Sequence, residues 1–380
     1  MFLTFRESRF DVRVLILLRM LWTAGAQRIA VNEYRWLKKL GYDAQIVFLR
    51  ASNIKGYEEL LKDVDYTVIR KTSGPLTPVF SAITKKFAKD RGSESTVDLD
   101  LILKTPEIAK KKKADYLVCH DQWAGLGGYL AKKTLGLPYV VFIHEKLSDY
   151  SVPLLGKLAT DVEKKVLENA EKVLAVTDKV AKTVEEKHGV RATVNFPGLD
   201  ELSSTPLSQK ENLLLTVAFW DKGRKPEIYL DIAEKIGGHK LIFAGNWRIP
   251  ELKRDFLIKV GKRGLEDKVL LKEGLSEKEL TGLYKKSKFL LRFGFGEYGL
   301  GTPVVEALQH TLPVIVNEEL GTSSLIKAYK CGYVLPDINP NAVAEIVSSI
   351  DEEQYTSMQL GISKLRNVYT WERHARQLIS

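Results

Sequence analysis

Residues 289–316 read FLLRFGFGEYGLGTPVVEALQHTLPVIV, and this stretch contains the alternation that decides the fold. Short apolar runs at 289–291 and 313–316 are typical of buried strands, and the segment between them has a glycine-rich turn followed by a helical pattern. Parallel strands need a long crossover, which is usually a helix. The stretch therefore predicts a βαβ unit in a parallel sheet that is covered on both faces.

The same alternation runs along nearly the whole chain. Further strands are predicted at 12–18, 44–48, 66–69, 116–119, 139–143, 173–176, 192–196, 213–217, 240–244, 268–271 and 333–335. A turn-rich polar stretch at 196–209 interrupts the pattern and is typical of a linker. We therefore predict an α/β protein of two Rossmann-like domains, at 1–198 and 199–380, with a cleft between them. A polar helical tail at about 351–380 could cross back to the first domain.

The composition is that of an ordinary soluble globular protein, with 44% hydrophobic and 28% charged residues among 380. It excludes disordered, collagen-like and low-complexity classes. The net charge of +10 is uneven, since residues 1–200 hold 33 basic and 25 acidic side chains, a net of +8, which leaves +2 for residues 201–380. The first half is therefore expected to face an anionic partner, and nucleic acid is not expected as that partner.

The cysteines Cys119 and Cys331 lie in apolar runs and are interpreted as buried free thiols in a reducing compartment. The spacing of cysteine and histidine does not suggest a metal site. The N-terminus lacks the pattern of a signal peptide, and no apolar run reaches 18 residues. The expected location is the cytoplasm, with peripheral attachment to the cytosolic face of a membrane as an alternative.

The turn after the strand at 289–291 holds four glycines within eight residues, which let the backbone approach a ligand closely. Gly301 and Thr302 then open a helix whose N–H groups would suit a phosphate. Glu297 lies before this helix start and Glu306 about one turn into the helix. A plain loop before a capped helix explains the same residues. The turn matches neither a Walker loop nor the dinucleotide-binding fingerprint, so both interpretations stay open.

Residues 296–316 resemble the donor-site signature of the retaining glycosyltransferases of family 4, which reads roughly E-G-F-G-x-x-x-x-E-A-x-x-x-G-x-P-V-V. Other segments resemble that family's landmarks in register, and they lie at 14–28, 115–125, 138–144, 196–200 and 274–280. The resemblance spans about residues 12–350. It implies the two-domain GT-B fold and transfer of a sugar from a nucleoside-diphosphate sugar to a glycan or lipid-linked acceptor, with retention of configuration and without a metal or other cofactor.

Two departures from the family pattern bear on the site. Seven residues separate the family's two glutamates, whereas eight separate Glu297 from Glu306. Either the turn holds one extra residue, which we prefer, or Tyr298 takes the first position. Phe219 stands where the family has an arginine, and Arg224 stands at the position of its lysine. At least one cation is therefore retained, and arginine can bind phosphate oxygens through two N–H groups.

In the second domain the resemblance implies a donor site. Its candidate residues are Arg224 and Lys225 for the diphosphate, Gly301 and Thr302 for the same phosphates through backbone N–H groups, Glu306 for the ribose hydroxyls and Glu297 for hydroxyls of the transferred sugar. The alternative interpretations are a solvated basic turn, a capped helix start and two surface charges.

In the first domain the resemblance places His144 at the donor sugar near the reaction centre, and Gly25 in a turn that approaches the donor or the acceptor. His120 and Asp121 are weaker candidates for contact with the acceptor. A lone histidine after an apolar strand is more often structural, and a tight turn also requires glycine. Retention would follow the family's proposed front-face mechanism, in which the leaving phosphate takes the proton of the acceptor hydroxyl.

A further segment of the first domain could bind an anionic membrane surface. Apolar side chains at 80–87 are spaced for one helical face, and basic side chains line the rest. These residues are Phe80, Ile83, Phe87, Lys85, Lys86, Lys89 and Arg91. A helix packed on the sheet with a solvated face explains them equally.

Several alternatives to an active transferase remain. A catalytically silent GT-B relative that binds nucleotide sugars or acts as a scaffold is suggested by Phe219 and by the glutamate spacing. A nucleic-acid-binding protein is suggested only by the net charge. An epimerase or phosphorylase of GT-B fold is a weaker alternative.

Overall fold

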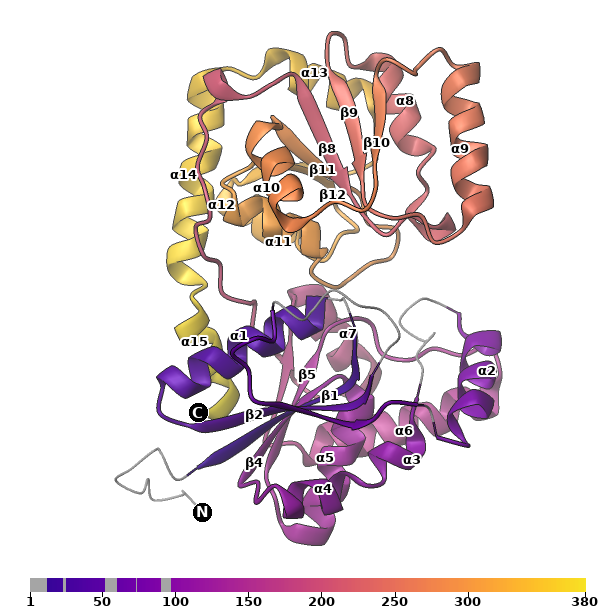
Figure 1. Cartoon of the computed structure of the whole chain (residues 1–380), viewed down its shortest axis with the longest axis vertical. Helices are drawn as coiled ribbons and strands as arrows, with labels where there is room; N and C mark the ends of the chain where they lie inside the picture. The colour runs from indigo at the N-terminus through magenta and orange to yellow at the C-terminus, as the bar shows by residue number, and fades with distance from the viewer. Residues whose placement is uncertain (1–11, 23–24, 52–59, 73, 90–96) are drawn as a thin grey trace. The chain divides into compact units, whose positions relative to one another are not determined.

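The computed structural model describes residues 12–22, 25–51, 60–72, 74–89 and 97–380 (Figure 1). Its internal contacts divide the chain into two compact units. The first unit comprises Met1–Gly198 and Trp371–Ser380, and the second comprises Leu199–Thr370. The predicted turn residues at 23–24 and the basic residue Arg91 lie outside the described residues.

In the first unit, the described residues form a seven-stranded parallel sheet with strand order β3-β2-β1-β4-β5-β6-β7. Its elements are β1 (Arg13–Leu21), α1 (Gly25–Lys39), β2 (Asp43–Ala51), β3 (Tyr66–Arg70), α2 (Thr77–Phe87), α3 (Leu99–Ile102), α4 (Thr105–Lys111), β4 (Tyr116–His120), α5 (Gln122–Leu135), β5 (Tyr139–Ile143), α6 (Pro153–Asn169), β6 (Lys172–Ala175), α7 (Asp178–His188), β7 (Thr193–Val194) and α15 (Trp371–Ile379). The strand order reverses direction between β1 and β4, and ligands of doubly wound sheets bind beyond the carboxyl ends of the strands at such a switch point.

In the second unit, the described residues form a six-stranded parallel sheet with strand order β10-β9-β8-β11-β12-β13. Its elements are η2 (Leu207–Gln209), β8 (Leu213–Val217), η3 (Lys222–Arg224), α8 (Ile228–Lys235), β9 (Lys240–Ala244), α9 (Pro250–Lys262), β10 (Val269–Lys272), α10 (Glu277–Lys286), β11 (Phe289–Arg292), α11 (Thr302–Gln309), β12 (Val314–Asn317), α12 (Ser323–Tyr329), β13 (Gly332–Leu335), α13 (Pro340–Ser349) and α14 (Glu352–Val368). Here the switch point lies between β8 and β11.

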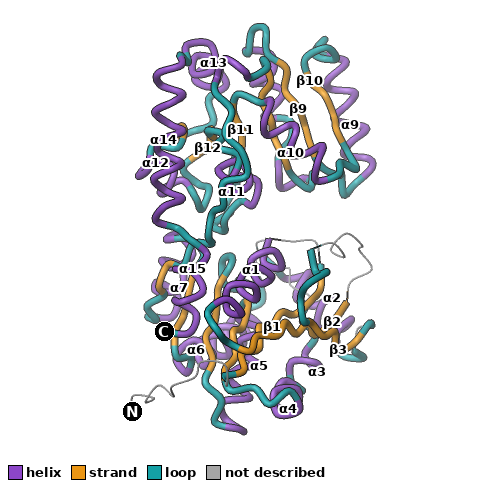
Figure 2. Tube along the Cα trace, turned by 60° about the vertical axis from the view of Figure 1, so that its left-hand side comes forward, coloured by secondary structure: helices purple, strands orange, loops and turns teal. Residues whose placement is uncertain are grey.

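Both sheets have helices on their two faces (Figure 2). The strands β5, β11 and β12 are buried along their whole length, as expected for parallel strands covered on both sides. In the second unit an aromatic cluster fills the core between the sheet and its helices, and it includes Trp220, Tyr229, Phe243, Phe256 and Phe293. This core holds the turns that follow β8 and β11 on a rigid base.

Local capping explains where several helices begin. Asp121 precedes α5, and its carboxylate accepts hydrogen bonds from the N–H groups of Trp123 and Ala124. Ser276 and Glu279 form a capping box at the start of α10, as the spacing of those residues favours. Asp121 has φ of +80°, a backbone conformation that is costly for a residue with a side chain. The cap therefore fixes the sharp turn between β4 and α5.

The predicted helical tail consists of two helices, α14 and α15. Helix α14 belongs to the second unit, and α15 belongs to the first, where it packs against α1. The helix is interrupted at Tyr369, whose N–H still bonds to the carbonyl of Leu365 and whose carbonyl accepts the N–H of Leu199. The chain thus returns to its first unit within its last ten residues.

Strands and helices lie close to the predicted positions, with differences mainly at their ends. The first strand is longer than the predicted 12–18 and runs to Leu21, where it pairs with Ala51 of β2. The strand predicted at 192–196 is reduced to Thr193–Val194, which pairs with the end of β6.

Candidate functional site

In the second unit the candidate site is built on the two turns that follow the strands of the switch point. The turn after β8 leads through η3 to Arg224, and the turn after β11 leads from Phe293 to the start of α11. Because β8 and β11 are hydrogen-bonded neighbours, their carboxyl ends bring these two turns together. This is where a doubly wound sheet binds its ligand.

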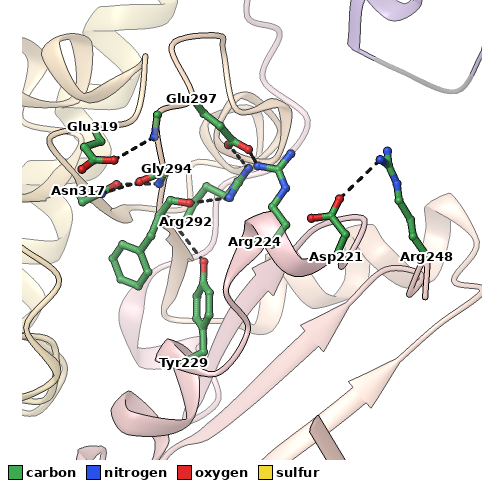
Figure 3. A network of polar contacts seen from close by, with 11 residues as sticks. Asp221, Arg224, Tyr229, Arg248, Arg292, Gly294, Glu297, Asn317 and Glu319 are labelled. Carbon is green, nitrogen blue, oxygen red and sulfur yellow. Dashed lines mark hydrogen bonds and ion pairs between the residues drawn. The ribbon is translucent and has the colours of Figure 1, made fainter. Parts of the chain in front are cut away.

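Glu297 is the centre of a charge network between these turns (Figure 3). Its carboxylate forms an ion pair with Arg224 of the turn after β8. It also accepts a hydrogen bond from the guanidinium of Arg292, at the end of β11, at 2.5 Å. Arg292 is buried and donates a second bond to the carbonyl of Phe293 at 2.7 Å. A carboxylate that is mostly buried is thus balanced by two guanidinium groups.

Backbone hydrogen bonds hold the glycine-rich turn in place (Figure 3). The N–H of Gly294 donates to the side chain of Asn317 at 2.8 Å, and the side-chain NH₂ of Asn317 donates to the carbonyl of Gly294 at 2.8 Å. The N–H of Gly296 donates to Glu319 at 3.0 Å. At Gly294 a Cβ would lie within 3.1 Å of the backbone of Leu320, so the close approach of the two segments requires glycine.

The helix α11 begins as expected from its sequence. Gly301 has φ of +57°, a left-handed conformation that suits glycine, and Thr302 and Pro303 form the first turn. Glu306 lies one turn further along and is half-buried. The hydroxyl of Tyr284, from α10, donates to the Glu306 carboxylate at 2.7 Å, and the Tyr284 ring is buried. The carboxylate is therefore held in one orientation beside the N-terminus of a helix.

The basic residues after β8 occupy an irregular turn. Lys225 has φ of +43° and is exposed, and its Nζ lies 4.4 Å from the centre of the Phe295 ring in the glycine-rich turn. Phe219 is partly exposed, and the guanidinium of Arg248, which follows β9, lies 5.5 Å from its ring centre. Arg248 also pairs with Asp221 at 3.6 Å. A cation therefore lies beside the position at which the family has its arginine.

In the first unit the predicted residues lie at the carboxyl ends of β4 and β5 and at the start of α1, where Gly25 is the first residue. His144 directly follows β5 and is half-buried, and its Nε2 lies 2.8 Å from Nδ1 of His120. The loss of water around its ring lowers the pKa of His144 well below its ordinary value. His144 is therefore neutral at pH 7.

The other two candidates of the first unit are engaged within the protein. His120 is 2% exposed, and its other ring nitrogen lies 2.7 Å from the carboxylate of Glu33. Asp121 caps α5 and also accepts a hydrogen bond from Arg19 at 2.5 Å. Both side chains are therefore engaged within the first unit, and their contact with an acceptor stays a prediction.

The structure thus brings the donor-site candidates of the second unit onto two adjacent turns, and it brings His120 and His144 into contact in the first unit. The sequence alone did not indicate Arg292, Tyr284, Arg248 or Glu33 as part of either site. An arginine that ends an otherwise apolar strand was the available signal for Arg292.

The described residues contain no group of three or more His, Cys, Asp or Glu side chains that could hold a metal ion. Within the same residues, every helix is too short or too polar to cross a bilayer.

Two family models match the chain. The glycosyl transferase 4-like domain matches residues 24–195, and the glycosyl transferases group 1 domain matches residues 200–364. No curated protein matches the sequence significantly.

Solved structures share the fold over nearly the whole chain at low sequence identity. Sucrose-phosphate synthase from Thermosynechococcus elongatus has a TM-score of 0.75 at 15% identity, with 97% of each chain covered. HepE from Anabaena, in complex with UDP and glucose, has a TM-score of 0.74 at 15% identity, with 97% of this chain and 98% of that chain covered. WaaG, a glycosyltransferase involved in lipopolysaccharide biosynthesis, has a TM-score of 0.65 at 15% identity, with 97% and 100% covered.

Proposed function

Because the chain belongs to the group 1 glycosyltransferases, with a glycosyl transferase 4-like domain before its group 1 domain, we propose that it transfers a sugar from a nucleoside-diphosphate sugar to a glycan or lipid-linked acceptor. The observation that carries this proposal is the position of Arg224, Glu297 and the start of α11 on the two turns of the second switch point. That arrangement joins a cation, a carboxylate and a helix N-terminus, which suit a phosphorylated sugar.

Each group of this site has a proposed role toward the donor. Arg224 and Lys225 bind the diphosphate, and the N–H groups of Gly301 and Thr302 point at the same phosphates from the N-terminus of α11. Glu306 accepts hydrogen bonds from the ribose hydroxyls. Glu297 accepts hydrogen bonds from hydroxyls of the transferred sugar, since Arg292 holds its carboxylate in place.

We propose retention of configuration through a front-face reaction without a metal. The bond from the anomeric carbon to the diphosphate oxygen breaks, and a bond to the acceptor oxygen forms on the same face. The proton of the acceptor hydroxyl passes to the departing diphosphate. Arg224, Lys225 and the helix N-terminus offset the charge that develops on the diphosphate. His144 contacts the transferred sugar as a neutral imidazole.

The basic first unit is proposed to approach an anionic membrane surface from the cytoplasm. In helix α2 the threonines Thr77 and Thr84 are buried, whereas Val79 and Ile83 are exposed, so the outward side carries apolar residues. Leu154, at the start of α6, is 78% exposed. The end of α2 and the residues after it are hydrogen-bonded to the segment before α6, which brings the end of α2 near the start of α6. The exposed side chains of Lys85, Lys86 and Lys89 add positive charge to this surface.

This surface differs from the one predicted from helical spacing. Phe80 and Phe87 are half-buried and only Ile83 of the predicted trio is exposed. The reason is that the Thr77 hydroxyl bonds to Asp98 at 2.8 Å, which turns the polar side of α2 inward. Binding to vesicles of phosphatidylglycerol, compared with vesicles of phosphatidylcholine, tests this part of the proposal. Val79→Glu should weaken binding to the anionic vesicles, and equal binding by that variant would contradict it.

A catalytically silent binding protein is the second candidate. It is favoured by Phe219, which replaces the family's arginine, and by the engagement of Arg224 with Glu297. Arg248 beside the Phe219 ring argues in the other direction, because it supplies a cation at that place. Only turnover separates the two candidates.

The test is a thermal-shift screen over UDP-, GDP- and ADP-sugars, followed by transfer assays with the sugar that raises the melting temperature most. We expect one nucleotide sugar to bind, and its sugar to be transferred to an acceptor. Arg224→Ala should reduce transfer, and an unreduced rate would contradict the site. Binding without turnover across all acceptors would establish the silent protein instead. Added EDTA should leave transfer unchanged, and its loss would contradict the metal-free reaction.

A further inference from the structure

A buried chain of hydrogen bonds connects the C-terminal helix to His144. Glu33 of α1 is fully buried, and its two carboxylate oxygens lie 2.7 Å from Nε2 of His120 and 2.8 Å from Nε2 of His374. His120 in turn lies 2.8 Å from His144, and the two rings are nearly parallel. The order of groups from α15 to the end of β5 is therefore His374, Glu33, His120 and His144.

The partners of His374 determine its protonation. Its Nδ1 lies 3.3 Å from the backbone carbonyl oxygen of Phe196, and its Nε2 faces the Glu33 carboxylate. Both partners are oxygen atoms that can only accept, so both ring nitrogens donate and His374 is an imidazolium. This cation is fully buried next to the buried carboxylate, and it neutralises that charge. Burial alone raises the pKa of Glu33, but the hydrogen bonds from His120 and His374, together with the charge of His374, oppose this and keep the pKa below its ordinary range.

The protonation of the other two histidines follows. His120 must carry its hydrogen on Nε2, because that atom faces the Glu33 carboxylate. With Glu33 already neutralised by His374, a second buried imidazolium would be uncompensated, so His120 is neutral and its Nδ1 is an acceptor. Nε2 of His144 then donates to His120, and Nδ1 of His144 carries the lone pair. Among the described residues, that Nδ1 has no hydrogen-bond partner.

We propose that Glu33 and His374 are positioning residues, which fix the histidine pair so that Nδ1 of His144 accepts a hydrogen bond from a hydroxyl of the bound sugar. The C-terminal helix thereby becomes part of the reaction site. The role toward the sugar rests on the proposed function, whereas the arrangement of protons does not.

The direct test is NMR of the full-length protein labelled with ¹⁵N-histidine, which reports which ring nitrogens are protonated. We expect His374 to be protonated on both nitrogens and His144 on Nε2 alone. His374→Gln keeps a donor to Glu33 but removes the charge. The uncompensated carboxylate should then draw a second proton onto His120, whose Nδ1–H donates to His144 and moves the His144 proton to Nδ1.

The matched control is the double variant Glu33→Gln/His374→Gln. It removes the carboxylate together with its cation, so His120 should return to the neutral form and His144 to protonation on Nε2. His374→Gln should lower kcat at least about tenfold with little change in KM, and the double variant should recover most of this loss. Should His374→Gln fail to fold, Glu33→Gln alone serves, because without the carboxylate His374 should lose one proton.

Protonation of Nδ1 of His144 in the unmodified protein would overturn the proposal. So would a His374→Gln variant that folds with the His144 proton still on Nε2. If the protonation states are as expected but no nucleotide sugar is turned over, the proposed function fails while the arrangement of the proton chain stands.

Discussion

Replacing Glu306 tests the donor site most directly. Glu306→Ala removes the carboxylate, and Glu306→Gln removes its charge while keeping its shape. Tyr284→Phe removes only the hydroxyl that donates to Glu306 at 2.7 Å. The exposed glutamate Glu345, on α13 of the same unit, provides the control, because Glu345→Ala removes an equivalent helix carboxylate away from the turns after β8 and β11.

The expected size follows from the bonds that are lost. A hydrogen bond to a charged group contributes about 1.5–3 kcal/mol, which corresponds to a loss of about 10- to 150-fold in affinity. Glu306→Ala should therefore raise the Kd of the nucleotide by about this factor. Tyr284→Phe keeps the Glu306 carboxylate and removes only the hydroxyl that orients it. We therefore expect the Kd to rise by less than about tenfold and the free energy of unfolding to fall by about 1 kcal/mol. Glu345→Ala should leave the Kd unchanged.

The assay is isothermal titration with the nucleoside diphosphate found in the screen and with its 2′-deoxy analogue. The unmodified protein should bind the ribose form more tightly than the deoxy form. Glu306→Ala should bind both forms with similar affinity, because the acceptor for the hydroxyl is missing. If Glu306→Ala still discriminated between the two forms as the unmodified protein does, the assignment of Glu306 to the ribose would be wrong.

Three further changes probe the frame of the site. Gly321→Ala should lower the free energy of unfolding, measured by urea denaturation, by more than about 2 kcal/mol, because its Cβ would overlap the carbonyl oxygens of Tyr298 and Gly299. The control is Gly282→Ala on α10, where the space is open, and it should be neutral or stabilising. Burial, with the charges of Lys285 and Lys210, lowers the pKa of His310 to about 4. Between pH 6.5 and 4 the unfolded chain therefore binds more protons than the folded protein, and the free energy of unfolding should fall on the order of 3 kcal/mol as the pH drops through that window. His310→Gln should weaken this dependence of stability on pH. Glu297→Gln should reduce transfer strongly and Tyr298→Phe weakly, and the reverse order would assign the first-glutamate position to Tyr298.

The alternation of strands and helices could be predicted because it depends on local periodicity. Every predicted strand has a counterpart, and the glycine-rich turn lies where the sequence indicates, with Gly301 in the left-handed conformation that its position requires. The order of strands in each sheet is a long-range property, so the switch points between β1 and β4 and between β8 and β11 could come only from the resemblance or from the structure.

What the sequence could not provide are pairings that carry no local pattern. Glu33 and His374 are 341 positions apart in the sequence, and both look like ordinary polar residues of amphipathic helices. The inward face of α2 depends on a bond from Thr77 to Asp98, which spacing alone cannot reveal. In both cases a buried polar contact, rather than hydrophobic periodicity, determines which side chain faces the interior.

Both units use a carboxylate between two cation-forming side chains, but with different consequences. In the second unit Glu297 is paired with Arg292, which is buried, and with Arg224, which is less so. A diphosphate that drew Arg224 away would leave Glu297 still compensated by Arg292, so the exchange need not create an unpaired buried charge. In the first unit Glu33 is enclosed by His120 and His374 with no exposed partner to exchange. The network around Glu297 can therefore change its partners without leaving a buried charge unpaired, whereas the histidine chain keeps one arrangement.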